Sequence, residues 1–191
     1  AANADVKNGF LHPKKDLEQN TIVTFNVLEA MRKNKIKKII FSSTGSIYGE
    51  PKNFPTKENS PFPQQTSLYG SSKLSCEALI QSYCSGFGFN SIIFRFVSIM
   101  GSRYTHGHLF DFYKQLLKNK KKLKVLGNGL QKKSYLNIND CISAMLMTLK
   151  KNNNQKVEIY NLGTDKFITV KYSIKIILKI LNLNPKIYYS G

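Results

Sequence analysis

Tyr69 and Lys73 form the pattern Tyr-x-x-x-Lys within a segment whose apolar residues repeat at helical spacing. On a helix, this spacing places a phenol and an ammonium on one face, with Cβ atoms about 5 to 6 Å apart. A nearby cation favours the phenolate, so such a pair can make a tyrosine a usable acid or base near neutral pH. The same spacing is common in ordinary surface helices, so the pair alone does not define a site.

A segment rich in hydroxyl side chains precedes this pair. It reads FSSTGSIYG from Phe41 to Gly49, directly after a short apolar run, and it places Thr44 25 residues before Tyr69. A threonine hydroxyl at this point could hydrogen-bond a reacting oxygen, or it could only cap the end of a strand. Four later segments read RFVSIMG (95–101), LGNG (126–129), KSYLNIND (133–140) and YNLG (160–163).

In this order, the segments resemble the nucleotide-sugar epimerase and dehydratase branch of the extended short-chain dehydrogenase/reductase superfamily. The resemblance covers essentially the whole chain. Its opening Ala1-Ala2 resembles the loop after the fourth strand of the family's sheet, and Asn20 falls at the Asn of the following helix. Ser98 stands where the family usually has Asn, and Lys133 stands where it usually has Arg.

The resemblance implies a role for each matching residue. Tyr69 would take a proton from a sugar hydroxyl as hydride passes to NAD, Lys73 would hold the nicotinamide ribose and lower the pKa of Tyr69, and Thr44 would bind the reacting oxygen. These three are the expected catalytic residues. The implied cofactor-binding residues are Ala2, Asn20, Ser42, Ser43, Tyr69, Lys73 and Phe96. The implied substrate-binding residues are Thr44, Ser98, His108, Val125 and Lys133.

No metal site is expected. His106 and His108 are two residues apart, but no Asp, Glu or Cys accompanies them at ligand spacing. A polar substrate contact is the better interpretation of His108. Lys133 could reach a diphosphate as a point charge, without the fork of an arginine, or could simply be one more lysine of a lysine-rich chain.

The positions after Thr44 bear on the reaction. The 4,6-dehydratases of the family carry an Asp-Glu pair there, whereas this chain has Gly45 and Ser46. Without these carboxylates, elimination of water lacks its acid and base, which favours a UDP-sugar 4-epimerase. A dehydratase, decarboxylase or reductase of the same family remains open, as does a Rossmann-like fragment that binds RNA or a protein without catalysis.

A glycine-rich dinucleotide turn after a strand is missing from the 191 residues. We therefore expect a fragment that lacks this turn and the C-terminal end of the substrate region, inactive alone and prone to aggregation. NADP is not excluded as the cofactor, because the deciding acidic residue is also missing.

The elements that must position these residues alternate along the chain. Apolar spacing predicts helices from Pro13 to Lys33, with apolar residues at Leu17, Ile22, Phe25, Val27, Leu28 and Met31, and from Ser67 to about Gly86, with Leu68, Leu74, Ala78, Leu79 and Tyr83. Further helices are predicted at 109–118, after an Asp140 N-cap and after Thr169. Strands are predicted at 36–41, 91–97, 123–126, 134–138, 157–161 and 186–189. The polar, Pro-rich stretch 42–65 reads as a long functional loop, and 150–154 as a helix end and turn.

This alternation predicts an α/β fold with a Rossmann-like, doubly wound parallel sheet whose N-terminal strands are missing, and part of a smaller C-terminal substrate domain. We expect residues 1–100 to be the C-terminal half of the NAD-binding domain. Residues 101–191 would be the mixed substrate-binding region, from which a strand near 157–162 returns to the sheet. Family habit implies a homodimer through helices 13–33 and 67–85.

Composition sets the remaining bounds. The net charge of +18 comes from 29 Lys and Arg against 11 Asp and Glu, but the lysines accompany Asn and Ile, as in proteins of AT-rich genomes. Nucleic acid is therefore not the expected partner, and a UDP-linked sugar is. Three cysteines without a paired spacing favour a reducing cytoplasm. No apolar run reaches the roughly 20 residues of a membrane span.

Overall fold

The computed structural model describes residues 2–4, 9–51, 53–62, 64–151 and 155–191. The chain folds into two compact units. The first is Ala1–Val97 with Leu146–Leu162, and the second is Ser98–Met145 with Gly163–Gly191. Each unit is described by itself.

A three-stranded parallel sheet is the centre of the first unit. Its order is β1 (Lys38–Thr44), β2 (Asn90–Phe96) and β7 (Val157–Leu162). The register places Thr44 beside Phe96 and Phe96 beside Leu162. Because all three strands run the same way, these residues share the carboxyl edge of the sheet, which is where α/β folds build their sites. Among the described strands, only β2 pairs with β1.

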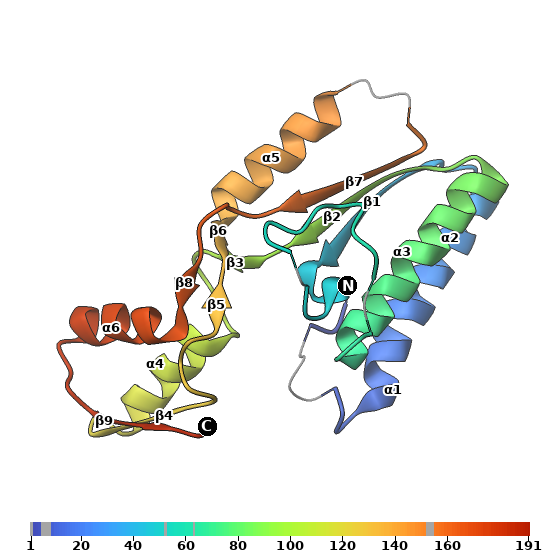
Figure 1. The fold of residues 1–191 in the computed structure, drawn as a ribbon. Coiled ribbons are helices and arrows are strands. Elements are labelled where there is room, and N and C mark those ends of the chain that lie inside the picture. Colours follow the sequence, from blue (N-terminus) through green and yellow to red (C-terminus); the bar gives the residue numbers. More distant parts are fainter. Residues whose placement is uncertain (1, 5–8, 52, 63, 152–154) are drawn as a thin grey trace. The chain divides into compact units, whose positions relative to one another are not determined.

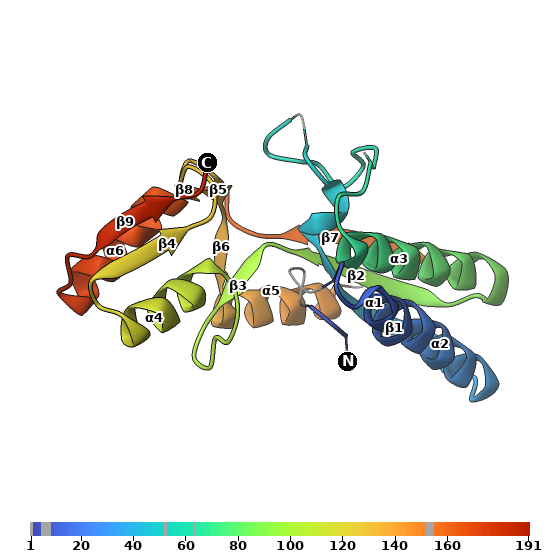
Figure 2. The same cartoon turned by 90° about the horizontal axis from the view of Figure 1, so that it is seen from below.

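Helices line one face of this sheet, where α2 (Val23–Lys33) and α3 (Leu68–Phe87) lie side by side (Figures 1 and 2). The helical run of α2 begins with α1 (Pro13–Asp16) and one π-helical segment, η1 (Leu17–Ile22). The core between helices and sheet consists of Leu28, Met31, Ile80, Tyr83, Cys84, Phe89 and Ile93.

Short sheets and two amphipathic helices make up most of the second unit. Its elements are β3 (Ser98–Met100), α4 (His108–Lys118), β4 (Lys122–Val125), β5 (Lys132–Lys133), β6 (Tyr135–Asn137), β8 (Ile168–Thr169), α6 (Val170–Leu181) and β9 (Lys186–Tyr189). The pairs β3-β6 and β4-β9 are parallel, and β5-β8 is antiparallel. Its core is Phe112, Leu116, Leu123, Val125, Val170 and Ile174. Helix α5 (Ile138–Lys150) belongs in part to each unit.

The apolar stripe of the first helix is only partly buried. Leu17, Ile22, Phe25 and Val27 are 43 to 52% exposed, whereas Leu28 and Met31 are buried. Polar residues at Asp16, Asn20 and Thr24 take the inward positions instead. The reason is specific pairing with α3, because Asn20 Nδ2 donates to Ser72 Oγ (2.8 Å) and Thr24 Oγ1 donates to Cys76 Sγ (3.3 Å).

Three smaller expectations also need correction. Ser42, Ser43 and Thr44 end β1 instead of opening a loop, and the 3₁₀ helix η2 (Gly45–Tyr48) follows them. Ala78 is exposed on α3. Asp140 lies within the first turn of α5 and not before it. Pro63 and residues 152–154, predicted to lie in a loop and a turn, are outside the described residues, as is Ala1.

Other boundaries are confirmed. Ser67 caps α3, since its Oγ accepts from Gly70 N at 3.0 Å, and Gly88 ends that helix with a φ of 67°. Thr169 caps α6 by accepting from Tyr172 N at 3.1 Å. The strand predicted at 186–189 is β9.

Candidate active site

The end of β1 and the first turn of α3 bring two of the predicted catalytic residues together. Thr44 is the last residue of β1, and its Oγ1 accepts from Ser46 N at 3.1 Å, which starts η2. Tyr69 is the second residue of α3 and is half-buried. Thr44 lies near enough to Tyr69 for its hydroxyl to act to lower the pKa of the phenol. A phenol and an alcohol that lie 25 positions apart in the sequence thus become neighbours.

Lys73 lies one turn further along α3, with only 5% of its surface exposed. Its Nζ donates to the backbone oxygen of Ser42 at 2.7 Å and lies 4.4 Å from the centre of the Phe41 ring. The ammonium is therefore fixed against the carboxyl half of β1. Because an ammonium carries three N–H donors and one is used here, two remain for other acceptors.

The pKa of Tyr69 is raised. Burial is the largest cause, the Thr44 hydroxyl acts in the opposite direction, and the Asp16 carboxylate adds to the increase. The pKa of Lys73 is lowered, chiefly by burial, while Cys76 and Glu77 act to raise it. Desolvation therefore dominates the titration of both groups, and the lowering of the Tyr69 pKa by Lys73 stays a prediction.

Asn20, a predicted cofactor residue, lies in a buried polar cluster behind Tyr69. Its Oδ1 accepts from Asn3 N (2.8 Å), and its Nδ2 donates to Asn3 O (3.2 Å) and to Ser72 Oγ. Ser72 Oγ in turn donates to the backbone oxygen of Tyr69 at 2.9 Å. These contacts give Asn20 a positioning role, and its contact with a cofactor stays a prediction.

The remaining predicted cofactor residues of the first unit lie in different surroundings. Ser42 is exposed at the end of β1, and Phe96 is half-buried at the same edge, beside Thr44. The hydroxyl of Ser43 is buried and donates to Glu77, so it faces away from solvent. Ala2 is exposed and has no described contact that would assign it a role.

Two predicted substrate residues of the second unit neighbour the same tyrosine. Ser98 pairs with Tyr135 across β3 and β6, and the Tyr135 hydroxyl lies 3.0 Å from His108 Nε2. Burial raises the pKa of Tyr135 to about 12, helped by Tyr104, with a hydrogen bond to Ser173 opposing. His108, the first residue of α4, is therefore hydrogen-bonded to the protonated phenol of Tyr135 on β6.

The other two predicted substrate residues differ in exposure. Val125 is 1% exposed in the core of the second unit, and its backbone oxygen accepts from Ser190 N at 3.1 Å, so its side chain is unavailable to a ligand. Lys133 is exposed on β5. A point charge on a short exposed strand can attract an anion but is not held in one direction.

Sequence reasoning missed the polar residues that hold this site from below. Glu77, Arg95 and Tyr48 are all buried, and Arg95 donates hydrogen bonds to both of the others. One signal was present, because Glu77 lies four residues after Lys73 and so shares its face of α3. Arg95 was noticed only as part of a family pattern.

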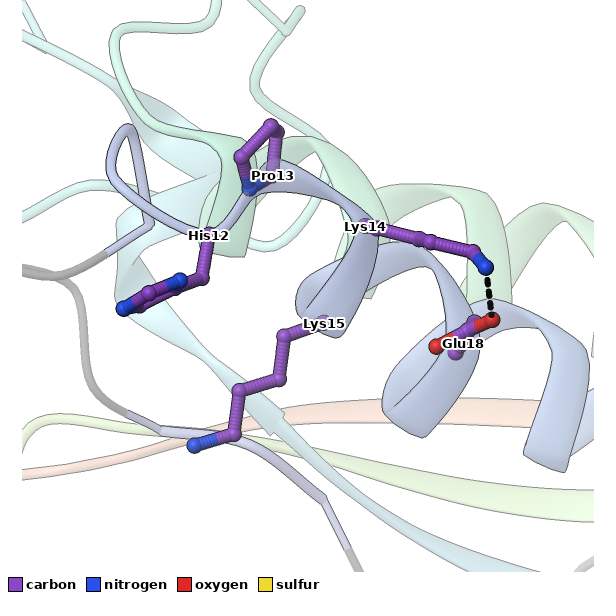
Figure 3. A pocket seen from close by; sticks show the side chains of 5 residues that line it. All are labelled: His12, Pro13, Lys14, Lys15 and Glu18. Carbon is purple, nitrogen blue, oxygen red and sulfur yellow. Dashed lines mark ion pairs between the residues drawn. The ribbon is translucent and has the colours of Figure 1, made fainter.

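Hollows and clusters elsewhere suggest no rival site. A shallow open hollow at the start of α1 is lined by His12, Pro13, Lys14, Lys15 and Glu18, and the Lys14–Glu18 ion pair of 3.2 Å crosses one side of it (Figure 3). It shares no residue with the Thr44–Tyr69 pair. Within the described residues, no group of three or more His, Cys, Asp or Glu could hold a metal ion, and no helix is long and apolar enough to cross a membrane.

The arrangement suits proton transfer to and from an alcohol. A phenol supplies the acid or base, a threonine hydroxyl can fix the same oxygen, and an ammonium stands one helical turn away. The donors around Lys73 and Ser42 fit the ribose end of a nicotinamide nucleotide. The glycine-rich turn that would bind the pyrophosphate is not among the 191 residues.

Comparison with known proteins gives consistent relatives. A putative UDP-glucose 4-epimerase of Methanocaldococcus jannaschii is 36% identical over 93% of this chain and 58% of its own length. A dTDP-D-glucose 4,6-dehydratase of Dictyostelium discoideum is 31% identical over 96% of this chain and 44% of its own length. The chain thus spans about half the length of the curated relatives it matches.

Solved structures agree with these relatives. The UDP-glucuronic acid 4-epimerase from Bacillus cereus, in complex with UDP-glucuronic acid and NAD, superposes with a TM-score of 0.90 at 29% identity, covering 99% of this chain and 60% of that one. The α/β architecture with parallel strands is therefore the Rossmann-like fold of these epimerases. The sequence profile of the NAD dependent epimerase/dehydratase family matches residues 1–163, and the chain belongs to that family.

Proposed function

We propose that the protein containing this chain is an NAD-dependent nucleotide-sugar epimerase that interconverts UDP-hexoses at C4. The observation that carries the proposal is the placement of Tyr69 near Thr44, with Lys73 buried one turn further along α3. This is the set that reversible oxidation of an alcohol needs: a proton acceptor, a donor to the same oxygen and a fixed cation.

Each residue has one task in this proposal. Thr44 holds the C4 oxygen of the sugar, and the Tyr69 oxygen accepts the hydroxyl proton as the C4 hydride leaves. Bound NAD would supply the hydride acceptor and a positive charge, which would lower the raised pKa of the phenol. Return of hydride to the opposite face of the 4-keto sugar, with return of the proton from Tyr69, completes the inversion. The free N–H donors of Lys73 would hold the nicotinamide ribose.

The positions after Thr44 separate epimerase from dehydratase. Gly45 and Ser46 open η2 where a 4,6-dehydratase would carry its acidic pair. With neither carboxylate present, the proposal assigns no elimination of water. A dehydratase, decarboxylase or reductase of the same family, with NADP as a possible cofactor, is the second candidate, because the relatives include a 4,6-dehydratase.

Product analysis tests this assignment. The full-length protein is incubated with UDP-glucose, UDP-galactose and their N-acetylated forms, and products are separated by chromatography. The proposal expects interconversion of C4 epimers without net consumption of NAD. Release of a keto sugar or of carbon dioxide, or stoichiometric consumption of NAD(P)H, would instead support the second candidate. Salt-sensitive RNA binding with no reaction on any sugar nucleotide would support a non-enzymatic fragment.

We further propose a homodimer through helices 13–33 and 67–85. Leu17, Ile22, Val23, Phe25 and Val27 are 36 to 52% exposed along η1 and α2, beside α3. A second copy of the chain could cover these exposed apolar side chains, as partners do at protein interfaces. Sedimentation of the full-length protein should give a dimer that Phe25→Glu with Val27→Glu converts to a monomer. A monomeric wild-type protein at roughly 100 μM, about a hundred times a Kd of 1 μM, would contradict the proposal. The three free, buried cysteines accord with a reducing, cytoplasmic setting.

A further inference from the structure

A buried ion pair lies beneath the candidate active site. Arg95 on β2 and Glu77 on α3 have side chains that are 1% and 0% exposed, and Arg95 Nη2 lies 2.8 Å from Glu77 Oε2. Arg95 Nε also donates to both carboxylate oxygens, each at 3.2 Å. Two charges are thus held out of water in a forked geometry that fixes the angle between helix and sheet.

The pair reaches the catalytic strand and the segment after it. Ser43 Oγ, next to Thr44, donates to Glu77 Oε1. Arg95 Nη1 donates to the hydroxyl of Tyr48 at 2.6 Å, and Tyr48 donates to Asn161 Oδ1 on β7 at 2.9 Å. One connected network therefore spans β1, β2, β7, η2 and α3. Thr44 lies between Ser43 and η2, so its backbone is held on both sides.

The same arginine anchors the long loop 49–65. Its Nη1 also donates to Glu58 O at 2.8 Å, and the Arg95 guanidinium carbon lies 5.1 Å from the ring centres of both Tyr48 and Phe62. Asn161 completes the anchor, because its backbone N donates to Glu58 Oε1 and its Nδ2 donates to Thr56 O, both at 2.8 Å. Hydrogen bonds from β2 and β7 therefore hold the middle of the loop that leads into α3 and Tyr69.

Stability alone does not explain such a pair. Desolvating two charges is expensive, and replacing a buried ion pair by apolar residues of similar volume is often neutral or stabilising. The fork, by contrast, allows a single relative placement of Glu77 and Arg95. Glu77 lies one helical turn after Lys73, so the rotation of α3 that the fork fixes also sets the direction of the lysine.

We propose that Glu77 and Arg95 are positioning residues for the reaction at Thr44, Tyr69 and Lys73, holding the end of β1, the start of α3 and the loop 49–65 in register. The inference rests on the proposed epimerase function. In this proposal, Glu77 and Arg95 themselves touch neither substrate nor cofactor. A displacement of about 1 Å at such a site can lower the rate about a hundredfold without unfolding the protein.

The main test is the full-length double variant Glu77→Leu with Arg95→Met, which removes both charges together. We expect kcat for epimerisation to fall about a hundredfold, while KM and the Kd for NAD each change less than about threefold and the melting temperature stays within about 5 °C. The matched control is Glu50→Gln, an exposed carboxylate in the same loop, which should retain wild-type kcat. Tyr48→Phe removes only one hydroxyl and should lower kcat by roughly fivefold, on the scale of one hydrogen bond.

Hydrogen exchange separates this inference from the proposed function. Exchange at residues 56–62 should accelerate in the double variant and stay unchanged in Glu50→Gln, whether or not the protein epimerises sugars. If the wild-type protein lacks epimerase activity but the loop loosens as expected, the function fails and the positioning contact stands. Unchanged exchange, or wild-type kcat in the double variant, would overturn the inference. A fall in kcat that is fully accounted for by a lower melting temperature would also overturn the inference. If the double variant fails to fold, the test rests on Tyr48→Phe, and wild-type kcat in that variant would overturn the inference.

Discussion

The two units of the chain differ in where their polar side chains lie. Of the buried polar or charged side chains among the described residues, all except that of Ser173 belong to the first unit. Half of them lie near the ends of β1 and β2 or on the inner face of α3, namely Ser43, Thr44, Ser72, Lys73, Glu77 and Arg95. The second unit instead has a core of aliphatic and aromatic residues, with its lysines on the surface.

This difference indicates where function restricts the sequence. A buried polar group costs free energy unless it is hydrogen-bonded, so a unit that keeps many of them must hold each in a fixed place. In the first unit, these groups surround Thr44, Tyr69 and Lys73. The predicted substrate residues of the second unit are exposed or half-buried, apart from Val125, and can adapt to a ligand. Rigid chemistry and adaptable binding would then be divided between the units.

Replacing one lysine in each unit should give the largest contrast. Lys73→Met removes a buried ammonium fixed to Ser42 O and should lower kcat/KM of the full-length protein about a thousandfold, or about 4 kcal/mol. Lys133→Met removes an exposed charge and should lower it about tenfold or less. Steady-state kinetics with a UDP-hexose measure both. A larger effect at Lys133 would invert the comparison.

Two hydroxyl deletions should sharpen the comparison between the two units. Ser43→Ala takes a donor from the buried Glu77 carboxylate and should lower the free energy of unfolding by about 1 to 3 kcal/mol. Ser134→Ala removes a hydroxyl of the second unit that bonds Thr164 near the surface, and it should cost less than about 0.5 kcal/mol. Urea unfolding of the full-length variants measures the two values. Equal losses would show that burial does not distinguish these polar contacts.

The smallest effect is expected at a surface pair of the first unit. The Arg32 guanidinium, with the Tyr83 hydroxyl, lowers the pKa of Glu29 from 4.5 to about 2. A depressed folded-state pKa adds stability above the unfolded value, and that stability is lost as pH falls through the folded value. The difference in melting temperature between the wild-type protein and Glu29→Gln should therefore shrink between pH 4.5 and pH 2. A difference that stays constant over this range would contradict the assignment.

Local signals in the sequence were sufficient for most element boundaries. Ser67 and Gly88 bound α3, and Thr169 opens α6, because capping residues act within one turn of the helix. The family pattern also selected Thr44 and Tyr69, which the structure places near one another. Their role in catalysis remains a prediction.

Long-range pairing was what the sequence could not show. The inward face of α2 is decided by partners on α3, more than 50 residues away in the sequence, and η1 alters the helical period just before it. The same limit applies to Glu77 and Arg95, whose polarity suggests a surface position until their partners are known. The direction of Lys73 could not be foreseen either, because spacing on a helix gives a face but no contact.

The central claim is that the phenol of Tyr69 carries the acid and base chemistry of a 4-epimerase. Its most direct test compares Tyr69→Phe with Tyr172→Phe, an exposed phenol on α6 of the second unit, in the full-length protein. We predict that Tyr69→Phe lowers kcat for UDP-hexose epimerisation about a thousandfold and that Tyr172→Phe has no effect. A Tyr69→Phe protein that kept more than about a tenth of wild-type kcat, a loss far below that of an acid/base group, would contradict the account.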